Sequence, residues 1–358
     1  MSELPTRVRM FKCLLPLLSV VITFLILELS ARTVKGKWGF RNFWLEDQAL
    51  LKSTYPVEFH PEFGWIPKPG YSGKNNYWGK NVTIDTNGLR IATQSSGMNM
   101  SEPILAVGDS FTFGDQVSDG ETWPAQLERL AGKTVINGGV FGYGFDQTYL
   151  RMLELNRRHR PSVIIMQLIP EDIDRCELSV RTSVPKPYFT IEDNSLVVHV
   201  DHIRRIEPVP SFLKKTGGYS YIFNECMERA FPSYWKVGSM EDKKAHDKGD
   251  QIASAIINSL NSFVKDNANV VRLIILAQYR WIDKPTDAER LRNLIRCRLD
   301  PRITFCDTYD PLELIRKNDP PAYRLLYAGH MTSGGNAFIA AKVWVLLSQR
   351  GEETDSRK

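Results

Sequence analysis

The chain has few cysteines, five in 358 residues, and none of them belongs to a CxxC pair or stands beside a His-rich stretch. The sequence therefore predicts no metal site. One cysteine, Cys13, lies in an apolar run, and the folded region holds the other four: Cys176, Cys226, Cys297 and Cys306. In an exported domain these four allow one or two disulfides, with Cys297 and Cys306 the closest pair in sequence. Four mostly buried free thiols fit equally well.

A large excess of charge is also absent. The net charge of +5 is small for this length, and the basic residues are scattered apart from one tight cluster, Arg157 to Arg160. That cluster ends an expected helix, where cations are favoured by the helix dipole, so it needs no ligand. We therefore expect no nucleic-acid partner. The sequence contains no internal repeat. Its composition, with 42% hydrophobic and 24% charged residues, is ordinary for a globular domain with an apolar anchor.

Only one apolar stretch is long enough to cross a membrane. Charge is absent from Cys13 to Leu27, and counting on past Glu28 to Ala31 gives 19 residues, just enough to span a hydrocarbon core. The basic residues before the stretch and the small pair Ser30-Ala31 also fit a cleavable signal peptide. Because the stretch is longer than most signal cores, we expect an uncleaved anchor over residues 13–31 after a cytoplasmic tail, residues 1–12. The catalytic part is then extracytoplasmic, either periplasmic or extracellular.

The rest of the chain divides by pattern. Residues 32–100 are rich in Gly, Pro, Asn and aromatics, so we expect an extended juxtamembrane segment that packs on the main domain. Over residues 101–350, short apolar runs alternate with helical patterns, which predicts a parallel sheet of about five strands with helices on both faces. Residues 175–245 interrupt the alternation as an insertion with a hairpin, a natural lid or specificity element. Residues 351–358 form a polar tail.

A serine stands where an expected strand meets an expected helix. The apolar run Pro103 to Val107 is followed by Gly108-Asp109-Ser110, and such a glycine-flanked turn holds its serine at the carboxyl edge of a sheet. A serine hydroxyl needs a base to remove its proton. His330 is the candidate base, because it lies on a loop that opens into the last expected helix, Ala337 to Leu347, and therefore at the same edge.

These motifs resemble those of the SGNH, or GDSL-like, hydrolases of the membrane-anchored bacterial type, over about residues 101–350. Gly108-Asp109-Ser110 matches the nucleophile block, and His330 matches the base. The block Asn137 to Gly144 is similar to the family's glycine loop, with Gly142 as the amide donor of the oxyanion hole. The resemblance implies a flavodoxin-like three-layer sandwich, no cofactor, and an acyl-enzyme on Ser110 whose oxyanion is bound by the amides of Ser110 and Gly142.

Two family residues have no match. The family has a third conserved block, which normally carries an asparagine that donates a hydrogen bond to the oxyanion. In this sequence the matching stretch is Ile169-Pro170-Glu171-Asp172, so Glu171 stands at the position of that asparagine. Removing one such donor typically costs about 10² to 10³ in turnover, and an ionised carboxylate is worse than an absent donor. Three alternatives stay open: Glu171 is protonated, Glu171 turns away, or Glu171 or Asp172 orients His330.

The second missing residue is the aspartate that normally precedes the histidine as the acid of the triad. Tyr327-Ala328-Gly329 stands before His330 instead. Asp307, after the strand expected at Ile303 to Phe305, is a further candidate for this role. An aspartate at a strand end more often caps the helix that follows.

The resemblance predicts a membrane-anchored serine esterase that acts on O-acyl, including O-acetyl, groups of a small molecule or of an envelope or exported polysaccharide. An O-acyltransferase would use the same acyl-enzyme with a sugar hydroxyl in place of water. A non-catalytic binding protein on the hydrolase fold is the alternative from another class. A flavodoxin-like phosphate or nucleotide binder would use the loop Gly108 to Gly114, but it leaves His330 and Gly142 unexplained.

Overall fold

The computed structural model describes residues 6–44, 56–74, 79–91, 102–182, 184–204, 211–235, 242–279, 282, 284–295 and 299–349. The chain forms two compact units. The anchor unit combines Met1–Ser53 with Ile206–Ser239, and the sheet unit combines Thr54–Arg205 with Met240–Lys358. These units cut across the ranges expected from the sequence, because the expected juxtamembrane segment and the expected insertion each contribute to both.

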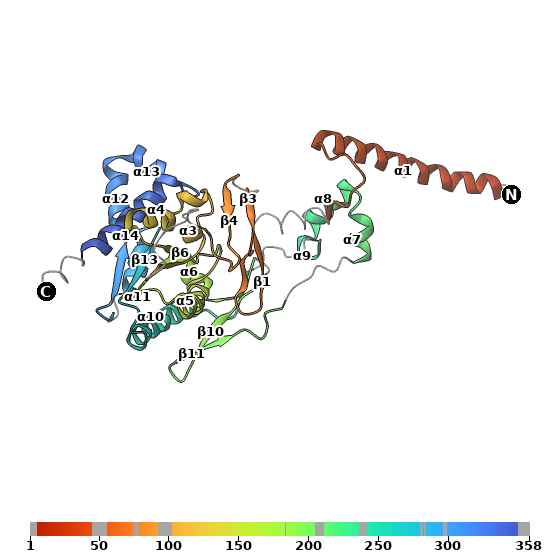
Figure 1. Cartoon of the computed structure of the whole chain (residues 1–358). Coiled ribbons are helices and arrows are strands. Elements are labelled where there is room, and N and C mark those ends of the chain that lie inside the picture. The colour runs from red at the N-terminus through yellow and green to blue at the C-terminus, as the bar shows by residue number, and fades with distance from the viewer. Residues whose placement is uncertain are drawn as a thin grey trace, which may run out of the picture. The chain divides into compact units, whose positions relative to one another are not determined.

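A five-stranded parallel sheet forms the centre of the sheet unit, with helices around it (Figure 1). The order of its strands is β14-β13-β7-β5-β6. Its strands are β5 (Ile104–Val107), β6 (Val135–Asn137), β7 (Val163–Leu168), β13 (Arg272–Ala277) and β14 (Ile303–Asp307). Counted along the chain, this order is 2-1-3-4-5, the flavodoxin-like order, whose ligand site lies at the carboxyl edge between the first and third strands. The predicted fold class, a three-layer α/β sandwich with five parallel strands, is confirmed.

Alternation along the strands explains why helices cover both faces of the sheet. Ile104 and Ala106 of β5 belong to one apolar cluster, and Leu105 and Val107 belong to the other, as the two-residue period of a strand requires. The helices of the first cluster are α4 (Trp123–Ala131) and α14 (Ser333–Gln349). The helices of the second are α5 (Phe145–His159), α10 (Gly249–Asp266), α11 (Pro285–Ile295) and α12 (Tyr309–Asn318).

Short elements surround the carboxyl edge of this sheet. The helical ones are α3 (Ser110–Phe113), the 3₁₀ turn η1 (Asp119–Glu121), α6 (Pro170–Arg175) and α13 (Pro320–Leu326). Three antiparallel hairpins are β1 (Val57–His60) with β2 (Gly64–Pro67), β3 (Ser72–Lys74) with β4 (Asn81–Thr83), and β15 (Tyr327–Ala328) with β16 (His330–Met331). The insertion contributes β8 (Leu178–Arg181), β9 (Val184–Pro185), the hairpin β10 (Tyr188–Glu192) with β11 (Ser195–His199), and β12 (Lys243–Lys244), which pairs with β8.

The anchor unit contains the long helix α1 (Thr6–Lys35) and three short helices, α7 (Phe212–Gly217), α8 (Tyr221–Ala230) and α9 (Pro232–Trp235). Within the described residues, α1 is the one helix long and apolar enough to cross a membrane, over Leu14–Lys35. By length and composition it fits an anchor or a signal sequence. The small core of this unit is aromatic, and Trp235 donates its indole N–H to Asn224 Oδ1 at 2.8 Å.

We predict that Gly108→Ala destabilises the sheet unit. A methyl group on Gly108 would lie 2.3 Å from Gln167 Oε1 and 2.4 Å from Thr112 Oγ1, and such overpacking typically costs about 1–3 kcal/mol. Gly120→Ala is the matched control, because its nearest neighbour, Arg129 Nη1, is 3.8 Å away. Chemical unfolding measures both variants, and equal midpoints would contradict the expectation.

Candidate active site

Ser110 is the first residue of α3 and follows β5 after only two residues. Asp109 caps this short helix, because its buried Oδ1 accepts a hydrogen bond from the amide of Phe111 at 2.9 Å. Gln167 of the neighbouring strand β7 accepts from the Asp109 amide at 3.2 Å and from Thr112 Oγ1 at 2.8 Å. The serine turn is therefore fixed by its own cap and by the adjacent strand.

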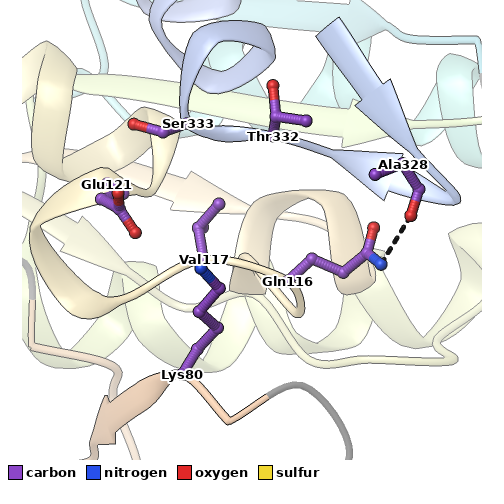
Figure 2. A pocket seen from close by; sticks show the side chains of 7 residues that line it. All are labelled: Lys80, Gln116, Val117, Glu121, Ala328, Thr332 and Ser333. Atoms are coloured by element: carbon purple, nitrogen blue, oxygen red, sulfur yellow. Dashed lines mark hydrogen bonds between the residues drawn. The ribbon is translucent and has the colours of Figure 1, made fainter. Parts of the chain in front are cut away.

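The structure brings His330 to Ser110 although 220 positions separate them in sequence. His330 Nε2 lies 3.0 Å from Ser110 Oγ, within the reach needed for proton transfer. Gln116 holds the hairpin that carries the histidine: its Oε1 accepts from the His330 amide, and its Nε2 donates to the Ala328 carbonyl at 2.7 Å (Figure 2). The imidazole ring also packs against Phe111, with the ring centres 5.1 Å apart.

Gly142 lies in the loop between β6 and α5 and has a left-handed backbone, with φ of +75°, which favours glycine. The Phe141 carbonyl before it accepts a 3.0 Å bond from the indole N–H of Trp65. Among the described residues, the amides of Ser110 and Gly142 meet no protein acceptor. Both N–H groups are available to a ligand oxygen.

Three carboxylates, Asp307, Asp172 and Glu171, were candidates for orienting His330, and among the residues that the structure describes none of them has a hydrogen bond to it. Asp307 pairs with Arg292 and accepts a 2.9 Å hydrogen bond from the amide of Tyr309, the first residue of α12. Asp172 accepts from the Ile169 amide at 3.0 Å and pairs with Arg175. Within the described part of the chain, none of Asp307, Asp172 and the half-buried Glu171 hydrogen-bonds His330.

Arg175 connects the serine turn, the glycine loop and α6, and it was not identified as a site residue from the sequence. Its Nη1 donates to Tyr143 O at 2.9 Å, lies 3.3 Å from Asp109 Oδ2, and also bonds Asp172 Oδ1. Asp109 Oδ2 is in turn 3.4 Å from Ser110 Oγ. Burial, reinforced by the nearby charge of Asp109 and opposed by Arg175, raises the pKa of Asp172 well above its usual range. The signal was available, since Asp172 and Arg175 are three positions apart on one helix.

A second buried ion pair lies next to this one. Lys186 follows β9 of the insertion, and its Nζ is 2.5 Å from Asp146 Oδ2, with both side chains fully buried. The same Nζ donates to the carbonyls of Leu178 at 3.0 Å and Arg175 at 3.2 Å. The first part of the insertion is therefore tied to the start of α5 and to the end of α6.

Arg90 holds the chain that follows the serine helix. Its buried guanidinium donates to the carbonyls of Phe113 and Val117, each at 2.7 Å, and to that of Gly114. Burial lowers the pKa of Arg90, although Asp119 opposes this shift. The stretch before residue 101, expected only to pack on the domain, thus positions the active-site turn through Arg90 and the glycine loop through Trp65.

A hollow of about 300 Å³ lies beside the histidine hairpin. Neither Ser110 nor His330 lines it, but Gln116 and Ala328 do, and these two residues contact each other next to His330 (Figure 2). The remaining lining residues are Lys80, Val117, Glu121, Thr332 and Ser333. Most of these side chains carry a hydrogen-bonding group.

Two expectations from the sequence concern a metal site and the cysteines. No group of three or more His, Cys, Asp or Glu side chains among them could hold a metal ion. Cys176, Cys226 and Cys306 are free thiols. The free Cys306 shows no disulfide with Cys297, which lies outside the described residues.

No protein-family model matches the sequence, and no curated protein matches it. A protein from Desulfitobacterium hafniense, described as lipolytic and of the G-D-S-L family, matches in structure with a TM-score of 0.38 at 14% identity over 68% of this chain and 99% of its own. An acetylxylan esterase from Geobacillus stearothermophilus matches with a TM-score of 0.39 at 13% identity, over 69% and 94%. These similarities are distant in sequence and assign no activity or substrate to this chain.

We predict that stability decreases as Asp115 ionises. Asp115 is buried, its Oδ1 has no hydrogen-bond partner, and burial raises its pKa to about 7, with Arg90 opposing the shift and Asp109 adding to it. The folded protein then binds the proton more tightly than the unfolded chain does, so stability falls as pH rises from about 4 to about 7.

Asp115→Asn should therefore match the wild type near pH 4 and exceed its unfolding free energy near pH 8 by up to about 4 kcal/mol. Thermal unfolding across this pH range measures the difference. Asp193→Asn, on the exposed β10–β11 turn, controls for the loss of one negative charge. A gap between Asp115→Asn and wild type that does not widen with pH would contradict the prediction.

Proposed function

We propose that this protein is a serine esterase of the SGNH type that hydrolyses O-acyl esters. The supporting observation is the 3.0 Å contact between Ser110 Oγ and His330 Nε2. It lies at the carboxyl edge of a 2-1-3-4-5 sheet, where this fold class places its ligands. A buried serine in contact with an imidazole, beside two unpartnered backbone amides, has the parts that acyl transfer requires.

The proposed reaction has two halves. His330 Nε2 removes the proton from Ser110 Oγ while that oxygen attacks the acyl carbonyl carbon, and the amides of Ser110 and Gly142 bind the resulting oxyanion. The imidazolium then gives its proton to the departing alcohol oxygen as the C–O bond breaks, which leaves an acyl group on Ser110. Water attacks this ester with His330 again as base, and release of the carboxylic acid restores the serine.

Asp109 and Arg175 are positioning residues in this proposal. Asp109 caps the serine helix, and Arg175 connects Asp109 to the Tyr143 carbonyl of the glycine loop. This connection fixes the distance between the two amide donors, because each donor lies directly beside one end of it. Two well-placed donors then replace the three that the family pattern contains.

The proposed substrate is an acylated carbohydrate, including O-acetyl esters of an envelope or exported polysaccharide. This class is supported by α1, because an enzyme anchored on the outer side of a membrane lies next to the acylated polysaccharides of the envelope. Helix α1 would hold the enzyme in the membrane with the sheet unit outside the cytoplasm, in a periplasm or in the extracellular space.

Transfer of the acyl group to a sugar hydroxyl is the same chemistry with a different acceptor. Product analysis with an acyl donor, in water alone and with added sugars, separates an esterase from an O-acyltransferase. Release of free acid at an unchanged rate in the presence of sugars supports hydrolysis.

We predict that wild-type protein reacts covalently with a fluorophosphonate probe and that Ser110→Ala does not. His330→Ala should react at least about 10² times more slowly, because the serine loses its base. Gel fluorescence measures labelling, and circular dichroism checks folding. A folded wild-type protein that stays unlabelled would indicate a non-catalytic binding protein.

We also predict that Gln116→Ala lowers turnover of a p-nitrophenyl ester about tenfold, since loosening of a base by a fraction of an ångström has effects of this size. Thermal unfolding checks that this variant still folds, because the Gln116 side chain is itself buried. Gln116→Glu keeps the acceptor for the His330 amide and should retain more activity than Gln116→Ala. Equal turnover in the two variants would mean that the glutamine does not position His330.

A further inference from the structure

The anchor unit exposes large aromatic side chains just after α1 and around α7 and α8. Trp38 and Phe40 are 57% and 91% exposed, and Phe212 and Phe231 are 81% and 58% exposed. Moving side chains of this size out of water is favourable, because it removes a large apolar area from the solvent. A group of them on two short segments marks an interaction surface.

Glu28 connects this surface to the helix that is apolar enough to cross a membrane. Its carboxylate accepts from Ser220 Oγ at 2.9 Å and from the amides of Tyr221 at 2.6 Å and Ile222 at 3.0 Å, at the start of α8. A carboxylate is favourable at a helix N-terminus, where the first N–H groups lack partners. A charge in an apolar helix is costly unless it is paired, and α8 together with Arg32 provides the pairing.

This contact fixes the level of α8 along α1. Glu28 comes seven residues before the end of the helix at Lys35, which corresponds to about 10 Å along the axis. If α1 spans a membrane, the start of α8 lies where hydrocarbon gives way to headgroups. The same arginine holds the chain after the helix at this level, because Arg32 donates to Gly39 O at 2.9 Å and to Tyr219 O at 2.5 Å.

The residue types on this surface are those found at the boundary between hydrocarbon and headgroups. Phe40 stacks on Tyr219 with ring centres 4.8 Å apart, and the exposed Lys35 and Lys215 lie close in sequence to Trp38 and Phe212. Aromatic rings are enriched at membrane–water interfaces, and lysines there reach lipid phosphates. Exposure of such rings to bulk water is unfavourable, whereas the headgroup region accommodates them.

We propose that residues 38–44 and 211–235 form a membrane collar, a ring-rich surface seated among the lipid headgroups around the end of α1. This proposal rests on the proposed role of α1 as an anchor and adds a function for the anchor unit. It also means that α1 is retained, because cleavage after Ala31 would separate Glu28 from α8.

Fluorescence quenching of the full chain in nanodiscs of phosphatidylcholine and phosphatidylglycerol tests the collar. Cys13, Cys226 and Cys297 are changed to serine, while the buried Cys176 and Cys306 stay. A nitrobenzoxadiazole label is then placed on one new cysteine at a time, in the variants Phe40→Cys, Phe212→Cys, Phe231→Cys and, as a reference within α1, Leu25→Cys. Three quenchers are used: lipids with a spin label near the headgroup for the collar labels, lipids with a spin label along the acyl chain for the Leu25 reference, and aqueous iodide.

We expect all three collar labels to lose more emission to the spin-labelled lipid than to iodide. Glu28→Ala should lower lipid quenching at the Phe231 label, whereas Glu225→Ala, which removes a carboxylate paired with Arg229 on the surface of α8, should leave it unchanged.

Greater quenching of the three collar labels by iodide, with the Leu25 label still quenched by lipid, overturns the collar and leaves the anchor intact. A Leu25 label that lipid does not reach overturns the anchor itself. Collar labels shielded from both quenchers would show that protein covers the surface, and this result also overturns the proposal.

Discussion

The hydrogen bond between Ser110 and His330 depends on a constraint of parallel sheets, namely that every strand ends at the same edge. β5 delivers Ser110 to that edge, and the chain returns there before α14 with the β15–β16 hairpin that carries His330. No single local element brings the two residues together, because 220 positions separate them in sequence. The contact follows from the sheet order and from Gln116, which fastens the histidine hairpin to the loop after the serine helix.

Much of this arrangement was accessible from the sequence, because its signals are local. The apolar run that ends before Gly108 predicted β5 to within one residue, and the last helix begins four residues earlier than expected, at Ser333. The serine and the histidine were located by their positions after a strand and before a helix. Gly142 was singled out by the family's loop pattern, and its backbone has the left-handed conformation that favours glycine.

Other features could not be predicted, because they depend on contacts between segments distant in sequence. Arg90 appeared to belong to an irregular stretch, yet it supplies the hydrogen bonds that shape the loop after Ser110. Gln167 is an exception, because it is the one polar residue in the apolar strand Val163–Leu168 and could have been noticed; it accepts a hydrogen bond from the serine turn. The triad acid was unassigned from the sequence, and in the structure Asp307 pairs with Arg292.

The buried pair of Lys186 and Asp146 changes how the insertion can behave. A segment that swings away from the active edge would pull the lysine out and leave an aspartate charge in a fully enclosed place, which is far more costly than breaking a surface pair. The ion pair therefore holds the strands beside Lys186 to the start of α5. Replacing either partner alone would leave the other as an unpaired buried charge, so variation at these two positions should be correlated.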